Sequence, residues 1–338
     1  MPKAAANKPV GSLRGRCRRQ PADSPAKSVE NDPGLTLSGH QGRGSLAFSS
    51  IVAQAWYALS GDLNMRILFV GDVVGASGVT VLSETLPSLR SRWSIDLAVV
   101  NGENSAEQGF GITFETYRAI RDAGADVVTL GNHSWNRREA LELAARDHRL
   151  VRPINYLPNT PGAGFVKVDT ANGKHVLVIN ALGRLFMEPV DDPFGAISRT
   201  LDLYPLSHEV DATVLDFHCE ATGEKQAMGR FCDGRVSVIA GTHTHTPSAD
   251  HRILPNGSAY ITDVGMTGDY NSVVGMDWRE PVNRFVTGLT NGRFLAAKGA
   301  ATLCGLAIEV EDRTGLAARI APIRIGPHLE PHEPTFWA

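Results

Sequence analysis

The sequence has 338 residues, of which 42% are apolar and 20% are charged, a composition typical of a soluble globular enzyme. This length fits one large α/β domain or two smaller ones. The formal charge of −3 gives no overall attraction to nucleic acid or anionic membranes, so a polyanion would have to bind locally. No apolar run reaches the roughly 18 residues that span a bilayer. The four scattered cysteines favour a reducing, cytoplasmic environment over a disulfide framework.

Residues 1–64 differ from the rest of the chain in composition. They contain eight Lys or Arg residues against four Asp or Glu residues, and they show no sustained helix or strand period. Such a segment buries too little apolar surface to offset the entropy lost on ordering. We therefore predict a disordered basic extension, or an upstream stretch translated from a start codon assigned too early. A targeting peptide and a basic arm that contacts RNA are the alternatives, and residues 51–59 could form a short helix.

From residue 65 the chain alternates between strand and helix patterns. Continuous apolar runs predict buried parallel strands at residues 66–72, 97–101 and 127–130. Helical patterns follow each of them, at residues 79–92, 113–123 and 137–146. This alternation indicates right-handed βαβ units whose sheet is covered by helices.

The central and C-terminal parts are richer in strand patterns. Residues 164–169 and 174–181 predict a hairpin with Asn172-Gly173 at its turn. Further buried strands are predicted at residues 214–217, 236–240 and 259–262, and a closing hairpin at 301–310 and 317–325. We find no internal repeat. The fold class is therefore α/β, a single domain over residues 65–326 built as a four-layer α/β/β/α sandwich with mixed sheets, followed by an irregular Pro-rich tail at 327–338.

Polar side chains cluster where these apolar strands end. Five strands each end in a group that can bind a metal ion: Asp72, Glu103 with Asn104, Asn132 with His133, His218, and His243 with His245. In open α/β sheets, ligands bind beyond the carboxyl ends of the strands. The sequence therefore predicts that these groups meet at one edge.

The residue types suit a pair of cations. Carboxylates, amide oxygens and imidazoles favour iron, manganese or zinc over calcium, and the absence of paired thiolates argues against a structural zinc site. Two cations about 3.5–4 Å apart need a bridging carboxylate, and Asp72 and Glu103 provide the negative charge. His243 and His245, two residues apart in a segment predicted to be extended, would project to the same side.

Each group also has an ordinary structural interpretation. Asp72 or Asn132 could cap a helix, Glu103-Asn104 could form a polar turn, and His218 could be a hydrogen-bonded core histidine. Taken together, however, five such coincidences at strand ends favour a metal centre.

With these residues assembled, the chain resembles the calcineurin-like metallophosphoesterases, and more closely their YmdB-type branch, known as 2′,3′-cyclic-nucleotide 2′-phosphodiesterases. The resemblance covers residues 65–325 and is carried by the following motifs: GDVVG (71–75), NGEN (101–104), TLGNH (129–133), DFHCEATGEK (216–225), AGTHTHTP (240–247) and TDVGMTG (262–268). The wider superfamily usually has Asp-x-His in its first motif, whereas position 74 here is Val. Asn104 replaces that histidine in the YmdB branch, so the departure supports the narrower assignment.

The resemblance implies a role for each position. One metal ion would be held by Asp72, Asn104 and His245, and the other by Asn132, His218 and His243. Glu103 would bridge the two ions, His133 would be the proton donor, and iron is the usual metal. The implied reaction is hydrolysis of 2′,3′-cyclic nucleotides to 3′-nucleotides by attack of a hydroxide that bridges the two ions.

Two other functions stay open from the sequence. A nucleotidase or general phosphatase would use the same metal centre on another substrate, because fold does not fix function. A regulatory scaffold for RNA-processing partners is the alternative from a different class, although unpaired buried carboxylates and imidazoles are unfavourable without a metal. The expected partners are a small cyclic nucleotide or phosphodiester substrate, RNA-processing proteins and further copies of the same chain in a homo-oligomer. No membrane association is expected.

Overall fold

Residues 64–337 are described by the computed structural model, and the first part of them alternates strands with helices. The elements are β1 (Met65–Val70), α2 (Gly75–Trp93), β2 (Leu97–Asn101), α3 (Phe114–Asp122), β3 (Val127–Thr129), α4 (Arg138–Arg146) and β4 (Leu150–Val151). The four strands are parallel, and the C-terminal hairpin of β11 (Leu303–Val310) and β12 (Ala317–Ile325) extends the sheet, with β11 pairing antiparallel to β1. The predicted βαβ units and closing hairpin are both present.

The middle of the chain forms a second mixed sheet. Its order is β5 (Phe165–Asp169), β6 (His175–Leu182), β7 (Ala212–His218), β8 (Val238–Thr242), β10 (Ala259–Ile261) and β9 (Arg252–Ile253). The strands β6, β7, β8 and β10 are parallel, whereas β5 and β9 are antiparallel edges. The β5–β6 hairpin turns at Asn172-Gly173 as predicted, and Gly173 takes the positive φ of 80° that such a turn requires.

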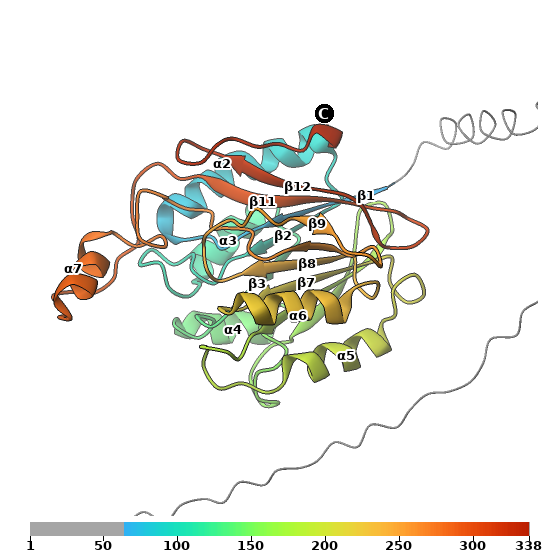
Figure 1. Ribbon diagram of the computed structural model, residues 1–338, viewed down its shortest axis with the longest axis horizontal. Helices are drawn as coiled ribbons and strands as arrows, with labels where there is room; N and C mark the ends of the chain where they lie inside the picture. Colours follow the sequence, from blue (N-terminus) through green and yellow to red (C-terminus); the bar gives the residue numbers. More distant parts are fainter. Residues whose placement is uncertain (1–63, 338) are drawn as a thin grey trace, which may run out of the picture. The chain divides into compact units, whose positions relative to one another are not determined.

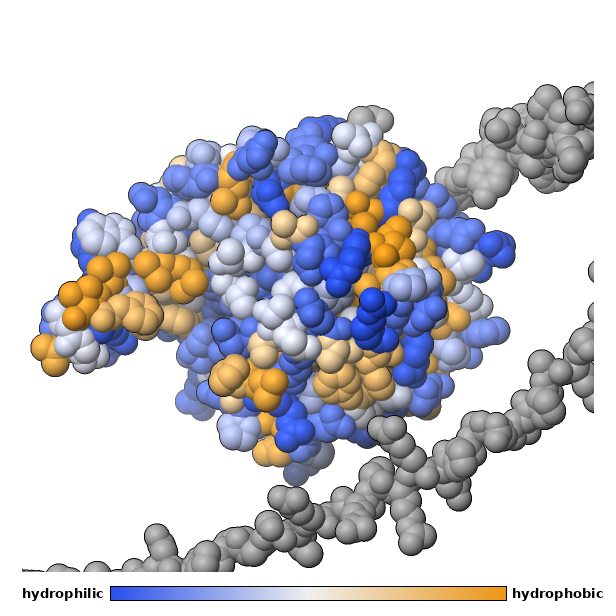
Figure 2. All heavy atoms as spheres, in the orientation of Figure 1, coloured by the Kyte–Doolittle hydropathy of each residue, from blue (hydrophilic) through white to orange (hydrophobic). Residues whose placement is uncertain are grey.

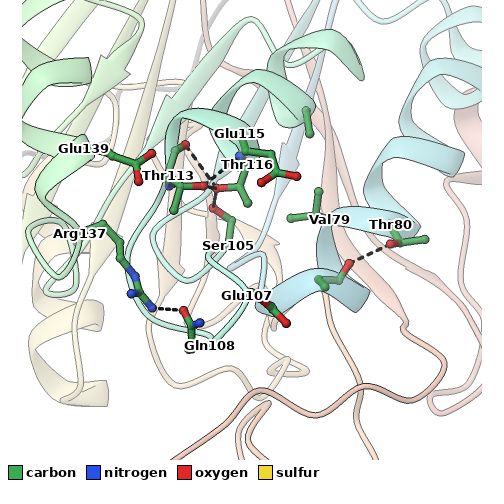
Figure 3. A pocket seen from close by; sticks show the side chains of 12 residues that line it. Val79, Thr80, Ser105, Glu107, Gln108, Thr113, Glu115, Thr116, Arg137 and Glu139 are labelled. Carbon is green, nitrogen blue, oxygen red and sulfur yellow. Dashed lines mark hydrogen bonds between the residues drawn. The ribbon is translucent and has the colours of Figure 1, made fainter.

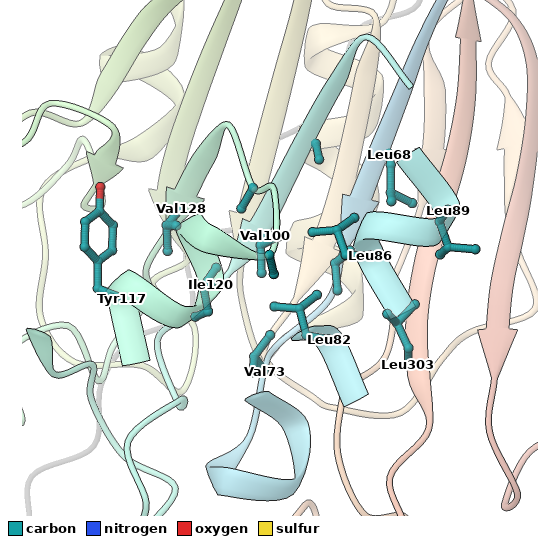
Figure 4. Close-up of a cluster of buried hydrophobic side chains, with 14 of the residues drawn as sticks. Leu68, Val73, Leu82, Leu86, Leu89, Val100, Tyr117, Ile120, Val128 and Leu303 are labelled. Carbon is teal, nitrogen blue, oxygen red and sulfur yellow. The ribbon is translucent and has the colours of Figure 1, made fainter. Parts of the chain in front are cut away.

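Three apolar layers hold the sheets and helices together. Successive side chains of a strand point to opposite faces, so Ile67 and Phe69 of β1 lie in the cluster between the sheets together with Val214 of β7. Leu68 and Val70 point the other way, towards α2 and α3, in the cluster that Figure 4 shows. A third cluster packs β6, β7 and β8 against α5 (Pro193–Leu203) and α6 (Thr222–Cys232). The predicted four-layer α/β/β/α sandwich is therefore confirmed (Figure 1).

Helices α5, α6 and α7 (Arg279–Thr287) were not predicted from the sequence. For α5 a signal was available, because Asp192 caps the helix by accepting hydrogen bonds from two backbone N–H groups and Pro193 occupies its first turn. In α6 the helical pattern is interrupted by Gly229, where a Cβ atom would lie 2.6 Å from the ring of Tyr260. Close packing against the sheet therefore requires glycine within this helix.

Helix α7 projects from the body of the domain (Figure 1). Only Pro281 is buried in it, whereas Phe285 and Val286 are 88% and 77% exposed. Figure 2 shows apolar side chains gathered on the projection. Within residues 64–337, no helix combines the length and apolarity needed to cross a membrane. The predicted basic extension and the short helix at 51–59 lie outside the described residues.

The C-terminal segment is anchored by its last described residue. The chain after β12 is mostly irregular and ends in a short 3-10 helix, η1 (Thr335–Trp337). Trp337 is only 3% exposed, and its ring lies 5.8 Å from that of Trp93 on α2. Both rings belong to the apolar cluster between the first sheet and helices α2 and α3.

We expect Trp337→Ala to lower the free energy of unfolding by about 3 kcal/mol, because it leaves a cavity in this cluster. Urea denaturation followed by circular dichroism measures the change. Leu157→Ala, at a side chain that is 68% exposed, is the matched control and should change stability by less than about 0.5 kcal/mol. Equal effects of the two substitutions would show that the tail does not stabilise the domain.

Candidate metal centre

The eight residues singled out from the sequence meet at one edge shared by the two sheets. They follow or end β1, β2 and β3 in the first sheet and β7 and β8 in the second: Asp72, Glu103, Asn104, Asn132, His133, His218, His243 and His245. Each has an atom within 3.6 Å of another member of the group. The expectation that strand ends bring these groups together is thus realised in the geometry.

One group of donor atoms surrounds Nε2 of His218. Oε1 of Glu103 and Oδ1 of Asn132 each lie 2.9 Å from this nitrogen, and Nδ1 of His243 lies 3.1 Å away. Glu103, His218 and His243 also form the one group of three acidic or imidazole side chains, within the part of the chain described, whose atoms could share a metal ion. Ligands bound to one ion at about 2.0–2.2 Å are roughly 3 Å apart, so this spacing suits a cation.

A second group forms beside it around Asn104. The side-chain amide nitrogen of Asn104 lies 3.1 Å from Oε1 of Glu103 and 3.2 Å from Nε2 of His245. The backbone of Asn104 is bridged to Val74, and N–H of Gly75 donates to its carbonyl at 2.9 Å. The structure therefore places Asn104 directly beside Val74.

Each imidazole has one ring nitrogen held and the other directed at the cluster. Nδ1 of His218 is 2.9 Å from Oγ1 of Thr242, and Nδ1 of His245 is 2.8 Å from the carbonyl of Val274. Nε2 of His243 is 3.1 Å from Oε2 of Glu220. A hydrogen-bond acceptor on one nitrogen fixes the tautomer and leaves the lone pair of the other free for a metal ion.

A buried carboxylate, that of Asp216, fixes the hydroxyl of Thr242, which in turn contacts His218. Thr242 donates to Oδ1 of Asp216 at 2.6 Å, while Thr129 and Asn101 donate to Oδ2 at 2.5 and 3.0 Å. Asp216 is fully buried, and burial raises its pKa to about 6. Asp216, Thr242 and Glu220 were not predicted from the sequence as parts of the site. Asp216 and Glu220 lie two residues before and after His218, and that proximity was the available signal.

Burial and charge set the protonation states of the cluster. Burial opposes ionisation of Glu103, but the neighbouring His218 lowers its pKa to about 2. Burial also disfavours the charged imidazole of His218, yet Glu103 and Asp72 raise its pKa to about 9. Burial, followed by the charge of His218, lowers the pKa of His243 to about 3. Without metal, His218 therefore carries a second proton, and a cation bound at Nε2 would replace it.

Two oxygen atoms in the centre support the fit of a cation. Oδ1 of Asp72 and Oδ1 of Asn104 are buried without a hydrogen-bond partner among residues 64–337. Burial raises the pKa of Asp72, and the nearby His245 and His218 oppose this rise. Metal ions bind buried oxygens and imidazole nitrogens of this kind, so the residue types present fit the implied ligand set. The amide of Asn104 would have to turn, because its nitrogen now faces Glu103 and His245.

Gly131 allows the two sheets to approach at the centre. A Cβ atom at this position would lie 2.3 Å from Oε2 of Glu103 and 2.5 Å from Nε2 of His218. Any larger residue would displace both groups, so glycine is required here by close approach.

His133 lies at the margin of the cluster. Its backbone N–H donates to Oε2 of Glu103 at 2.9 Å, whereas its half-buried ring packs edge-on against Phe110 with 4.8 Å between ring centroids. The ring lines the cavity above the centre. The side chain is therefore free to contact a bound molecule while its backbone positions Glu103.

The extended conformation predicted for residues 243–245 is wrong. Strand β8 ends at Thr242, and His243 and His245 adopt positive φ angles of 97° and 64°. Left-handed turns, and not strand alternation, direct both rings to the centre. Such strain in non-glycine residues needs support from the surroundings, and Asp263 provides it by accepting hydrogen bonds from N–H and Oγ1 of Thr244 at 3.0 and 2.7 Å.

Asp263 is paired in turn with Lys225 of α6, at 2.8 Å, and both side chains are almost fully buried. We expect Lys225→Met to lower the free energy of unfolding by about 3–5 kcal/mol, because it leaves the carboxylate of Asp263 buried without a counter-charge. Chemical denaturation in the presence of a chelator measures this without any contribution from metal binding. Lys298→Met, at an exposed pair with Glu107, is the control and should change stability by less than about 0.5 kcal/mol. A loss no larger than the control's would refute the role of the buried pair.

A separate cavity of about 500 Å³ lies beside α2 and α3 (Figure 3). It is lined by polar and acidic side chains that include Glu107, Glu115 and Glu139, and it contains none of the metal-binding candidates, although Ser105, the neighbour of Asn104, borders it. Ser105 donates to Thr116 at 3.0 Å, which anchors the loop after β2 to α3.

Comparison with known proteins identifies the family. The model of a family described as YmdB-like protein matches residues 68–323 of the chain. The chain belongs to the YmdB-like family. The family membership and the fold class predicted from the sequence are both confirmed.

Relatives of this YmdB-like chain align over almost their full lengths. It is 44% identical over 261 residues to the 2′,3′-cyclic-nucleotide 2′-phosphodiesterase of Bacillus subtilis (strain 168), covering 77% of this chain and 97% of the relative. A crystal structure of a hypothetical protein from Thermus thermophilus is 40% identical, with a TM-score of 0.72 over 78% of this chain and 99% of that one. A crystal structure of a novel phosphatase from Mycoplasma pneumoniae is 34% identical, with a TM-score of 0.72 over 78% of this chain and 94% of that one.

Proposed function

We propose that this YmdB-like protein is a metal-dependent phosphodiesterase that hydrolyses 2′,3′-cyclic nucleotides to 3′-nucleotides. One observation carries the proposal: three imidazoles, each with one nitrogen fixed by a hydrogen bond, direct their other nitrogen at the cluster around Glu103 and Asn104. The near full-length similarity to a phosphodiesterase of that name supports the substrate class.

The ligand assignment divides the cluster between two ions. Asp72, Asn104 and His245 would hold one ion, and Asn132, His218 and His243 would hold the other. Glu103 would bridge them, because its Oε1 contacts both Asn104 and His218. A bound metal pair would lower the pKa of water and neutralise the charge of the phosphate. Iron is the expected metal, with manganese or zinc as alternatives.

The protein's own groups would complete the reaction. Attack of hydroxide, formed from water, on phosphorus would form a new P–O bond and break the bond to the 2′ oxygen. That oxygen would leave as an alkoxide and need a proton. The imidazole of His133, in the cavity and outside the ligand groups, would donate that proton to the 2′ oxygen and leave a 3′-phosphate monoester.

A substrate panel on one purified, metal-analysed sample tests the proposal. We expect 2′,3′-cyclic nucleotides to be hydrolysed faster than 3′,5′-cyclic nucleotides or nucleoside monophosphates, with phosphorus NMR identifying 3′-phosphate as the product. Faster turnover of monophosphates would favour the nucleotidase alternative. A 2′-phosphate product would refute the direction of ring opening.

The cytoplasmic location, the homo-oligomeric state and the RNA-processing partners of this protein stay predictions. Comparing a metal-ligand variant with a gene deletion in cells would separate a catalytic role from a scaffolding role, because only the deletion removes the protein surface.

A further inference from the structure

The cavity above the metal centre has two chemically different sides. Its volume is about 470 Å³. Candidate ligands and His133, against which Phe110 packs, form the metal side, and the apolar side includes Val274, Met276 and Phe294. No lysine or arginine lines it among residues 64–337. A phosphate would therefore bind on the metal side, and the apolar side suits an uncharged, flat group such as a nucleobase.

Phe294 is held in place on the apolar side. The guanidinium of Arg284 lies 3.9 Å from the centroid of its ring. Arg284 is itself fixed, because it donates to Oε1 of Glu280 at 2.7 Å and to the carbonyl of Gly292 at 2.8 Å. An immobilised aromatic ring that borders a cavity is a platform on which nucleobases stack.

A larger cavity, of about 830 Å³, shares Phe110 and Phe294 with the first one. Its charged lining residues are all arginines, namely Arg137, Arg284 and Arg293. Arg284 is paired with Glu280, whereas Arg137 donates to the carbonyl of Phe110. Arg137 also donates to Gln108 (Figure 3). In the described part of the chain neither Arg137 nor Arg293 has a carboxylate partner. This cavity therefore offers cationic donors for an anion directly beyond the aromatic rings.

We propose that the substrate class of this centre is the 3′ end of an RNA chain that terminates in a 2′,3′-cyclic phosphate. The terminal base stacks against Phe294, and the phosphate that precedes the terminal nucleotide lies in the cavity with Arg137 and Arg293. A free cyclic mononucleotide has no second phosphate and leaves the arginines unused. This inference rests on the proposed function, since it uses the same reacting group at the same centre.

Steady-state kinetics with two substrates test the proposal. They are 2′,3′-cyclic AMP and the dinucleotide ApA ending in a 2′,3′-cyclic phosphate. We expect kcat/KM to be at least about 5-fold higher for the dinucleotide at 50 mM salt, since one phosphate gains charged contacts. Raising the salt to 200 mM should lower this ratio by roughly 2- to 3-fold, as expected when one phosphate contact on a single strand is screened.

Variants of one arginine locate the contact. Arg293→Ala should lower the ratio of the two kcat/KM values by at least about 2-fold, since only Arg137 then remains for the phosphate. Arg293→Lys should retain more of the ratio, because lysine also attracts phosphate. Arg279→Ala is the matched control, since Arg279 lies on α7, is exposed and does not line either cavity. The inference is wrong if Arg293→Ala and Arg279→Ala leave the same ratio, or if the unaltered protein hydrolyses both substrates equally well.

The two proposals fail in distinguishable ways. Hydrolysis of cyclic AMP without preference for the dinucleotide overturns the RNA inference and leaves the phosphodiesterase function intact. Hydrolysis of the dinucleotide alone supports the RNA inference and shows that mononucleotides are not the substrates. If metal-loaded protein hydrolyses neither compound, both proposals are wrong.

Discussion

Replacing Asp72 with asparagine should have opposite effects on the metal-loaded and the metal-free protein. With metal, we expect occupancy to fall and kcat/KM to drop on the order of 10³-fold, because several kcal/mol of charge stabilisation are lost. Without metal, the same substitution should raise the melting temperature. It removes a buried carboxylate whose Oδ1 has no hydrogen-bond partner in the described part of the chain.

The effect of Asp72→Asn on the stability of the metal-free protein should depend on pH. Burial raises the pKa of Asp72 above its ordinary value of 3.8. A carboxyl group whose pKa is raised on folding destabilises the folded state progressively as the pH rises above that ordinary value. The stability advantage of the Asp72→Asn variant over the unaltered chelated protein should therefore be absent near pH 3 and present at pH 7.

Calorimetry with and without chelator, together with elemental analysis, measures both effects. Asp122→Asn is the control, because Asp122 is 71% exposed and should change neither metal content nor stability by more than about 0.5 kcal/mol. Full metal occupancy in Asp72→Asn, or a lower melting temperature of its metal-free form at neutral pH, would contradict the ligand assignment.

The positions of the site residues followed from a simple rule, whereas their local conformations did not. Parallel strands carry their carboxyl ends to one edge, so Asp72, Glu103 and His218 could be brought together from strand patterns alone. The conformation of His243 depends on the buried Asp263 some twenty residues later, and such a tertiary contact leaves no periodic pattern in the sequence. For the same reason Glu220 could not be placed against His243.

The apolar lining of the cavity above the metal centre could not be predicted from the sequence either. Helix α7 buries only Pro281, so its apolar residues do not belong to a core-facing stripe of the kind that predicts a helix. The role of Phe294 depends on Arg284 and on a cavity between segments far apart in the chain. Helix α7 contacts the cavity through Pro281 and Phe285, and it packs little against the hydrophobic core. Its position therefore could not be predicted from a pattern of core residues.

Replacing His133 with alanine should reduce turnover while leaving the metal centre assembled. The contact between His133 and Glu103 is made by the backbone N–H, which alanine retains. Glu103 should therefore keep its position, and elemental analysis should find unchanged metal content. Loss of a general acid lowers kcat by roughly 10²–10⁴-fold, and we expect a loss in this range for 2′,3′-cyclic AMP.

A substrate whose leaving group departs without a proton distinguishes an acid role of His133 from a structural role. Bis(p-nitrophenyl) phosphate has a leaving group acidic enough to depart as an anion, so the variant should hydrolyse it within about 10-fold of the unaltered rate. Phe231→Ala, at a partly exposed aromatic residue on α6 outside the cavity, should leave both rates unchanged and serves as the control. An equal loss on both substrates in His133→Ala would mean that the residue positions the centre. Unimpaired hydrolysis of the cyclic nucleotide would mean that another group supplies the proton.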